Sequence, residues 1–153
     1  MQFLIIVLAT AFYSGYVPYA PGTAGSVVGI GVWILVFAPL MRTSPQAGLL
    51  LFAVLFVAGC YISERAEKIF AQHDSSLIVI DEVMGMVATM LFNPSGWLWI
   101  LGGFAAFRLF DVVKPFPASL IDRKMRGGTA VMLDDLAAAI YANLLLQVVS
   151  RVI

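Results

Sequence analysis

Long apolar runs separated by polar connections dominate the sequence. A helix that crosses a bilayer needs about 20 mostly apolar residues, and five runs approach that length. These runs are residues 26–41, 47–63, 78–92, 97–110 and 136–153. A sixth run, residues 3–13, is too short to span and predicts a re-entrant or interfacial helix.

The same runs indicate helices rather than strands. Inside lipid the backbone hydrogen bonds must be satisfied within the segment or within a closed barrel. Barrel strands alternate polar and apolar side chains, and the run over residues 49–59 does not. We therefore predict an all-α, integral membrane helical bundle with about five spans and the short N-terminal helix, in one domain over residues 1–153.

Composition agrees with this prediction and excludes several other classes. Hydrophobic residues make up 61% of the chain and charged residues 12%. So few charged residues cannot cover the surface of a water-soluble domain. A chain this apolar is also not disordered. The net charge of zero argues against a basic nucleic-acid binder. One cysteine, Cys60, and one histidine, His73, exclude an internal disulfide, a thiolate metal site and a multi-histidine zinc cluster.

The charged residues are distributed unevenly between the connections. If the spans alternate, residues 14–25, 64–77 and 111–135 lie on one membrane side, and the short turns 42–46 and 93–96 lie on the other. Most lysines and arginines fall on the first side, so the positive-inside rule predicts that it is cytoplasmic. All nine acidic residues also lie between positions 64 and 135.

The first polar segment, residues 16–26, has two prolines and two glycines before an apolar run. Thr23 or Ser26 is a candidate helix cap. Open N–H groups at such a helix start favour a phosphate, although an ordinary turn and cap explains the same residues.

The second segment places Asp81 and Glu82 at the start of an apolar helix. Adjacent helical residues point about 100° apart, so at least one carboxylate is expected to face the bundle. The simpler alternative is a solvated helix start that the helix dipole stabilises.

The third segment extends from Arg108 to Asp135. Arg108 and Asp111 are three residues apart, as are Asp111 and Lys114, so each pair shares a helix face. The prolines that follow are expected to end this helix, and Asp134–Asp135 is expected to open the last span. Two salt bridges and a basic loop on the membrane surface are the simpler interpretation.

Together, the three segments bring carboxylates and cations to one membrane face. Hard oxygen ligands without thiolates suit Mg²⁺, and arginine and lysine complement a phosphate group. This combination indicates phosphoryl chemistry.

The motifs resemble those of the phosphatidylglycerophosphatase A family. They comprise Pro21-Gly22-Thr23-Ala24-Gly25-Ser26, His73-Asp74, Asp81-Glu82-x-x-Gly85, Arg108-x-x-Asp111-x-x-Lys114-Pro115-x-Pro117, Asp122-Arg123, Gly127-Gly128 and Asp134-Asp135. Order and approximate spacing agree over residues 15–139, with Ala130 and Ala139 at positions where the family pattern has glycine. The resemblance implies an all-helical, Mg²⁺-dependent enzyme of the bacterial inner membrane, with its site facing the cytoplasm. It also implies hydrolysis of phosphatidylglycerophosphate to phosphatidylglycerol and phosphate, the step before cardiolipin synthesis.

Site roles follow as hypotheses from the resemblance and the chemistry. The predicted Mg²⁺ ligands are Asp81, Glu82, Asp134 and Asp135, and the predicted catalytic residues are Asp81, Glu82, Asp134 and Asp111. The predicted phosphate-binding residues are Arg108, Lys114, Arg123, Gly22, Thr23 and Ser26. Attack by a metal-activated water is the first choice and an aspartyl-phosphate is the alternative, with His73 either a general acid or a polar loop residue.

Two other function classes remain at this point. A non-catalytic membrane module would use the charges to bind anionic lipid, and it would tolerate Asp→Asn changes without requiring metal. A lipid-headgroup transferase would also use Mg²⁺ and acidic residues, but the Asp-Gly-x-x-Ala-Arg signature of CDP-alcohol transferases is missing.

Overall fold

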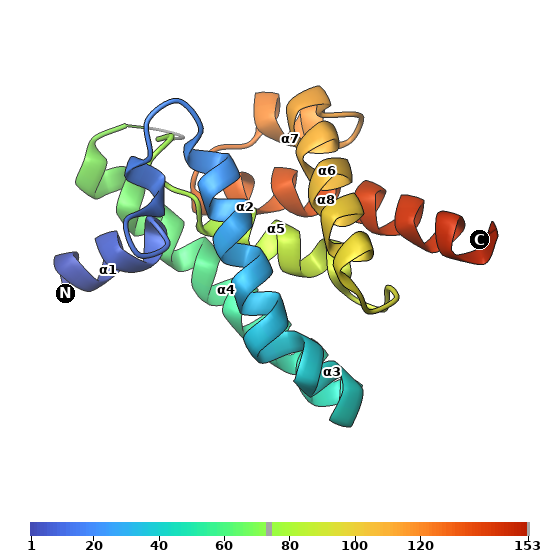
Figure 1. Ribbon diagram of the computed structural model, residues 1–153. Coiled ribbons are helices and arrows are strands. Elements are labelled where there is room, and N and C mark those ends of the chain that lie inside the picture. Colours follow the sequence, from blue (N-terminus) through green and yellow to red (C-terminus); the bar gives the residue numbers. More distant parts are fainter. Residues whose placement is uncertain (73–74, 153) are drawn as a thin grey trace.

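The computed structural model describes residues 1–72 and 75–152, apart from the side chains of residues 122 and 123. Within these residues the chain forms helices and no strand (Figure 1), which confirms the predicted all-α fold. The elements are α1 (Gln2–Ala9), a 3₁₀ turn (Ser14–Tyr16), α2 (Pro21–Val32), a π-helical turn (Trp33–Phe37), α3 (Ala38–Thr43), α4 (Pro45–Phe70), α5 (Ile80–Met90), α6 (Trp97–Val113), α7 (Ala118–Lys124) and α8 (Gly128–Val152).

Three helical stretches are long and apolar enough to cross a membrane. They are Pro21–Thr43, which joins α2 to α3, then α4 and α8. The other two predicted spans form shorter helices, because α5 has 11 residues and α6 has 17. At 1.5 Å per residue α5 is about 16 Å long, roughly half the hydrocarbon thickness. The number of spans therefore stays a prediction.

Helix α5 lies at the centre of the bundle and is buried along most of its length. It packs against α2 on one side and α8 on another, and α6 also packs against α8 (Figure 1). Its own Met86 and Met90 are among the largest buried side chains, together with Phe37 and Phe107 of the same core cluster. This packing fixes the start of α5, where Asp81 lies.

Small residues let α2 approach α5 closely. A Cβ atom on Gly29 would lie 2.8 Å from the Cβ of Met86 and 2.8 Å from the carbonyl oxygen of Val83. A Cβ on Gly25 would lie 2.8 Å from the Cβ of Val79. Close backbone approach through small residues is typical of helix pairs in membranes, and here it brings the start of α2 to the start of α5.

Asn143 of α8 holds the other end of α5. Its Nδ2 donates to the carbonyl oxygens of Ala88 at 3.1 Å, Thr89 at 3.0 Å and Leu91 at 2.7 Å. The last carbonyls of a helix lack intrahelical donors, and this amide adds a donor to them beside the hydrogen bonds that Ala88 and Thr89 accept from Leu91 and Asn93. No local sequence pattern marks Asn143 as a residue with a role.

The N-terminal segment forms a short helix, as the sequence predicted. Helix α1 lies beside the C-terminal part of α4 (Figure 1). Phe3, Leu4 and Phe12 leave large apolar surfaces exposed. Whether this helix inserts in the bilayer stays a prediction.

Candidate active site

Three carboxylates from two helices meet at the centre of the candidate site. Asp81 and Glu82 lie in the first turn of α5, and Asp135 lies in the second turn of α8. One oxygen from each carboxylate lies within 4.8 Å of the others, and we call these three residues the acidic cluster.

The acidic cluster fits a bound cation. Among the described residues, Asp81 Oδ1, Glu82 Oε2 and Asp135 Oδ2 are buried without a hydrogen-bond partner. Asp81 lies outside the three candidate membrane spans. Its burial, followed by the neighbouring Glu82 carboxylate, raises its pKa well above the usual range. Buried, mutually repelling carboxylates are unfavourable unless a cation compensates them. Three oxygen donors without sulfur or imidazole match the ligand preference of Mg²⁺.

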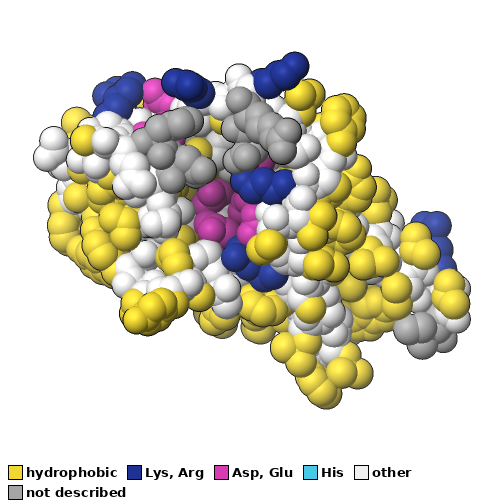
Figure 2. Space-filling view, turned by 90° about the horizontal axis from the view of Figure 1, so that it is seen from above, with side chains coloured by type: hydrophobic (Ala, Val, Ile, Leu, Met, Phe, Trp, Pro, Cys, Tyr) yellow, Lys and Arg dark blue, Asp and Glu magenta, His cyan; other side chains and the backbone are white. Residues whose placement is uncertain are grey.

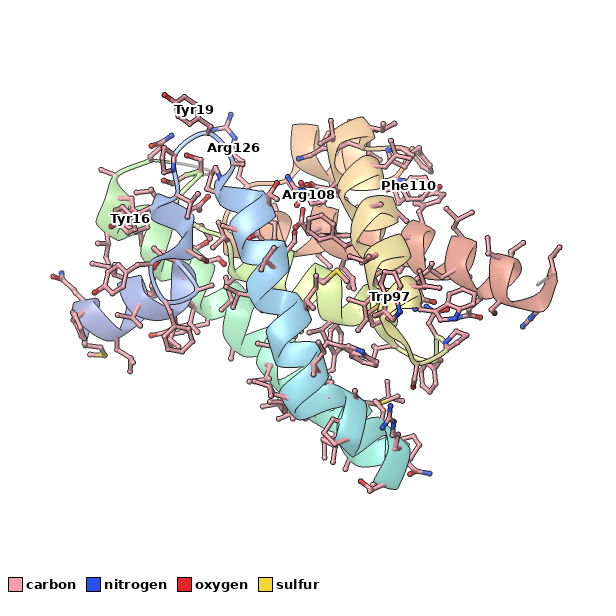
Figure 3. All side chains as sticks on the ribbon, viewed as in Figure 1. Tyr16, Tyr19, Trp97, Arg108, Phe110 and Arg126 are labelled. Atoms are coloured by element: carbon pink, nitrogen blue, oxygen red, sulfur yellow. The ribbon has the colours of Figure 1, made fainter. Side chains whose placement is uncertain are left out.

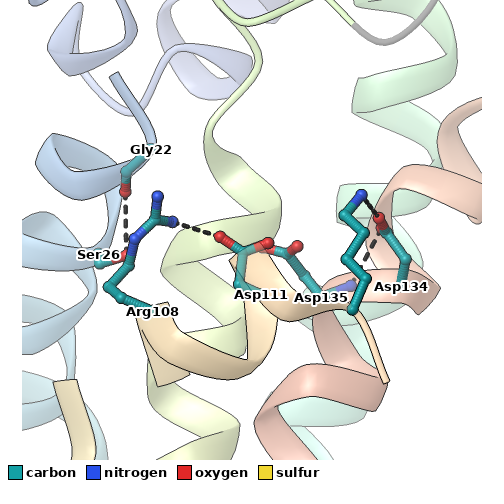
Figure 4. Close-up of polar contacts among 7 residues, drawn as sticks. Gly22, Ser26, Arg108, Asp111, Asp134 and Asp135 are labelled. Atoms are coloured by element: carbon teal, nitrogen blue, oxygen red, sulfur yellow. Dashed lines mark hydrogen bonds and ion pairs between the residues drawn. The ribbon is translucent and has the colours of Figure 1, made fainter. Parts of the chain in front are cut away.

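Arg108 and Asp111 of α6 border the acidic cluster. Arg108 Nη1 lies 2.6 Å from Asp111 Oδ2, as their spacing predicts. The Asp111 carboxylate lies beside that of Asp135 (Figure 4). Asp111 thus connects a guanidinium to the carboxylates, and this charge-assisted contact fixes the position of both side chains.

Asp134 points away from the acidic cluster toward Lys114. Helix α6 ends at Val113, and Lys114 follows with a left-handed φ of 45°, so its side chain leaves the helical register. Its Nζ lies 2.6 Å from Asp134 Oδ2, while Asp134 Oδ1 accepts a hydrogen bond of 3.0 Å from the N–H of Asp135. Of the four predicted metal ligands, the structure therefore groups three and pairs the fourth with a lysine.

The last helix begins earlier than the sequence predicted. Helix α8 starts at Gly128 rather than near residue 136, so the expectation that Asp134 and Asp135 open this helix is wrong. The Gly128 N–H donates to Glu64 Oε2 at 3.0 Å, and Gly127 adopts a φ of 88°. A carboxylate at a helix N-terminus satisfies an open N–H and favours the helix dipole. The cap comes from α4, far away in the sequence, so no local pattern reveals it.

The start of α2 lies against the acidic cluster through Gly22. A Cβ on Gly22 would overlap Glu82 Oε1 and lie 3.0 Å from Arg108 Nη1. The predicted caps Thr23 and Ser26 are wrong, because α2 starts at Pro21 and has no side-chain cap.

The hydroxyl of Ser26 points into α2 rather than toward an open surface. It is buried and donates to the carbonyl oxygen of Gly22 at 2.9 Å. Thr23 is half-buried in the first turn. The other predicted phosphate ligand, Arg123, and the candidate acid His73 fall outside the side chains that the structure describes.

The site opens at one end of the bundle. Seen from above the start of α2, acidic side chains lie at the bottom of a hollow bordered by lysine and arginine side chains (Figure 2). Figure 3 places Arg108 and Arg126 near this end, and Arg126 is exposed. Carboxylates below cations form an arrangement suited to a metal ion and a phosphate group.

Comparisons with known proteins agree with this chemistry. Residues 7–150 match the family model described as phosphatidylglycerophosphatase A. The chain is 39% identical to phosphatidylglycerophosphatase A of Haemophilus influenzae over 90% of this chain and 83% of that protein. It is 36% identical to the Escherichia coli protein of the same name, over 89% of this chain and 77% of the relative. A putative phosphatidylinositol-3-phosphatase of Bacteroides thetaiotaomicron is 35% identical over 99% and 97% of the two chains. No solved structure matches.

The family match and the names of the relatives identify a phosphatase, and the long apolar helices fit a membrane protein. The family match extends over nearly the whole chain, including every helix that contributes to the acidic cluster. The chain belongs to the phosphatidylglycerophosphatase A family.

Proposed function

We propose that the chain is a Mg²⁺-dependent lipid phosphatase that hydrolyses phosphatidylglycerophosphate to phosphatidylglycerol and inorganic phosphate. The observation that carries this proposal is the acidic cluster, with three unpartnered buried oxygens beside the guanidinium of Arg108. The family and the names of two relatives support the substrate. In this proposal the reaction precedes cardiolipin synthesis.

The acidic cluster would hold the Mg²⁺ ion. Asp81, Glu82 and Asp135 each direct a carboxylate oxygen into one small volume. A bound Mg²⁺ supplies a Lewis acid that stabilises charge on phosphoryl oxygens and activates water. Asp111 lies next to Asp135 and supports the cluster from α6.

The cations would bind the terminal phosphate. A guanidinium presents five donors, and the contact with Asp111 orients Arg108 without using all of them. Gly22 has no side chain, and this allows the side chains of Glu82 and Arg108 to lie directly against the start of α2. Lys114 lies at the edge of the site on Asp134, so a phosphate bound there would meet a lysine whose position is already fixed.

We further propose that the site faces the cytoplasm of a bacterial inner membrane. The hollow lies at the end of the bundle where α4 ends and α8 begins. The hydrogen bond from the Gly128 N–H to Glu64 joins these two helices at that end. The connections at this end carry most of the basic residues, and the positive-inside rule puts such connections in the cytoplasm.

The experiment that tests the substrate compares three lipids in detergent with Mg²⁺. They are phosphatidylglycerophosphate, phosphatidic acid and phosphatidylinositol 3-phosphate, the last chosen because one relative carries that name. We expect phosphate release from phosphatidylglycerophosphate with a kcat/KM at least tenfold above the others. Faster hydrolysis of phosphatidylinositol 3-phosphate would reject the proposed substrate and keep the phosphatase.

The Asp135→Asn variant supplies the control for the same assay. It keeps the shape of the side chain and removes one charge from the acidic cluster. We expect its phosphate release to fall by about 100-fold or more, since the interaction with the ion depends on that charge. Unchanged release would show that hydrolysis does not depend on this charge and would reject the proposed role of the acidic cluster.

A further inference from the structure

A groove outside the candidate active site lies between α1 and the C-terminal part of α4. Its volume is about 490 Å³. It is lined by Met1, Gln2, Ile5, Tyr61, Arg65, Lys68 and Ile69. None of these residues belongs to the acidic cluster or borders it in the described structure.

The α4 wall of the groove combines positive charge with an aromatic and an apolar surface. Tyr61, Arg65 and Lys68 follow the helical repeat and share one exposed face of α4. The Arg65 guanidinium lies 5.1 Å from the centroid of the Tyr61 ring. Stacking of this kind holds a guanidinium in place and leaves its in-plane donors available.

The opposite wall comes from the start of the chain, where Met1 and Ile5 add apolar surface beside the polar side chain of Gln2. Ile5 of α1 and Ile69 of α4 line the groove together with Met1. A soluble anion would gain nothing from these side chains, whereas an acyl chain would bury apolar surface against them. Lys68 Nζ lies 2.9 Å from Glu64 Oε1 and, with three donors, can bind a further acceptor. Arg65 and Lys68 beside apolar side chains therefore match an amphiphile with an anionic headgroup.

The position of the groove along α4 fits the headgroup level of a bilayer. The part of α4 before its first charged residue extends from Pro45 to Ser63. At 1.5 Å per residue it measures about 28 Å, close to the hydrocarbon thickness of about 30 Å. Arg65 and Lys68 follow directly, where long cationic side chains reach phosphate groups.

The groove lies on the same membrane side as the acidic cluster. Glu64, between Tyr61 and Lys68 on α4, accepts the hydrogen bond from Gly128 at the start of α8. Asp135 lies about two turns further into that helix. A lipid in the groove would belong to the leaflet from which the active site takes its substrate.

We propose that this groove binds an anionic glycerophospholipid of that leaflet. The headgroup phosphate lies between Arg65 and Lys68, and the upper part of one acyl chain lies against Ile5 and Ile69. The site is separate from catalysis, and the proposal does not depend on which lipid the enzyme hydrolyses.

A photo-crosslinking experiment tests the site directly. The protein is placed in phosphatidylcholine nanodiscs that contain phosphatidylglycerol with a diazirine near the top of one acyl chain, and labelled peptides are mapped. We expect labelling of residues 1–9 that unlabelled phosphatidylglycerol suppresses and extra phosphatidylcholine does not. The double variant Arg65→Gln/Lys68→Gln is expected to lower the apparent affinity about 30-fold, or ~2 kcal/mol at ~1 kcal/mol per basic residue.

Two controls separate a specific site from general charge attraction. Arg42→Gln/Arg151→Gln removes two basic residues from the last turns of α3 and α8, on the predicted opposite membrane side, and should leave labelling of residues 1–9 unchanged. Arg65→Lys/Lys68→Arg keeps the charge and should retain most of it. Equal labelling in the Arg65→Gln/Lys68→Gln variant, or equal loss in the Arg42→Gln/Arg151→Gln variant, would overturn the proposal.

The enzyme assay distinguishes this proposal from the proposed function. With a short-chain substrate in detergent, the Arg65→Gln/Lys68→Gln variant should hydrolyse at the wild-type rate, because neither residue contacts the acidic cluster. Loss of hydrolysis in this variant would contradict a groove separate from catalysis. Lack of hydrolysis in the wild type would reject the proposed function and leave the crosslinking result intact.

Discussion

Replacing Gly22 with alanine tests how closely the start of α2 approaches the acidic cluster. The added Cβ would overlap Glu82 Oε1 and lie 3.0 Å and 3.2 Å from the two terminal nitrogens of Arg108. Carbon atoms in ordinary contact are about 3.5–4.0 Å from their neighbours, so the Glu82 oxygen must move by roughly 1 Å. The obstacle is the end of a flexible side chain, and we therefore expect the fold to remain intact.

The expected loss falls on catalysis rather than on stability. A displacement of about 1 Å at a catalytic group can lower the rate by about 100-fold, which corresponds to ~2.7 kcal/mol of transition-state stabilisation. We expect a loss of this size in kcat/KM for phosphate release. The free energy of unfolding should change by less than about 1 kcal/mol, since alanine is a better helix former than glycine.

The matched control is Gly31→Ala in the same helix. A Cβ at Gly31 meets no heavy atom within 4 Å, so activity should stay at the wild-type level. Its stability should rise by up to about 1 kcal/mol. Phosphate release and thermal unfolding in detergent are measured for both variants. Wild-type activity in Gly22→Ala would refute the close approach between α2 and the cluster.

Three further predictions concern the helices that surround the acidic cluster. Gly128→Ala would place a Cβ against the backbone of α4 at Glu64, and we expect about 1–3 kcal/mol of destabilisation in thermal unfolding. Asn143→Ala removes the donor to the end of α5. We expect the free energy of unfolding to fall by about 1–2 kcal/mol in the same measurement. An unchanged melting temperature would contradict this role. Asp135→Asn should weaken Mg²⁺ binding at least about tenfold by calorimetry, whereas Asp134→Asn should change it by less than about threefold, since Asp134 faces a lysine. Equal effects of the two variants would contradict the assignment of ligands.

Local patterns predicted most of the helices, although α7 lies inside residues 111–135, which were expected to form a polar connection. The apolar runs locate the six predicted helical segments. A segment in lipid must satisfy its own backbone hydrogen bonds, and a helix does so. The spacing of Arg108 and Asp111 predicts their contact, since residues three apart share a helix face. Asp81 and Glu82 were placed correctly at the start of a helix.

Contacts between residues far apart in the sequence could not be predicted from these local patterns. Glu64 caps the last helix from α4, so the sequence around Gly128 gave no reason to begin the helix there. Adjacent helical residues point about 100° apart, but which of Asp134 and Asp135 meets the carboxylates of α5 and which meets Lys114 depends on how the helices pack. The role of Asn143 also depends on a helix end more than 50 residues away in the chain.

The central claim is that the acidic cluster holds a metal ion required for hydrolysis. The most direct test measures phosphate release from phosphatidylglycerophosphate by the purified protein in Mg²⁺ and in EDTA. We expect a decrease of at least about 100-fold in EDTA, with recovery when Mg²⁺ is restored in excess. Equal rates under both conditions would contradict the proposed role of Asp81, Glu82 and Asp135.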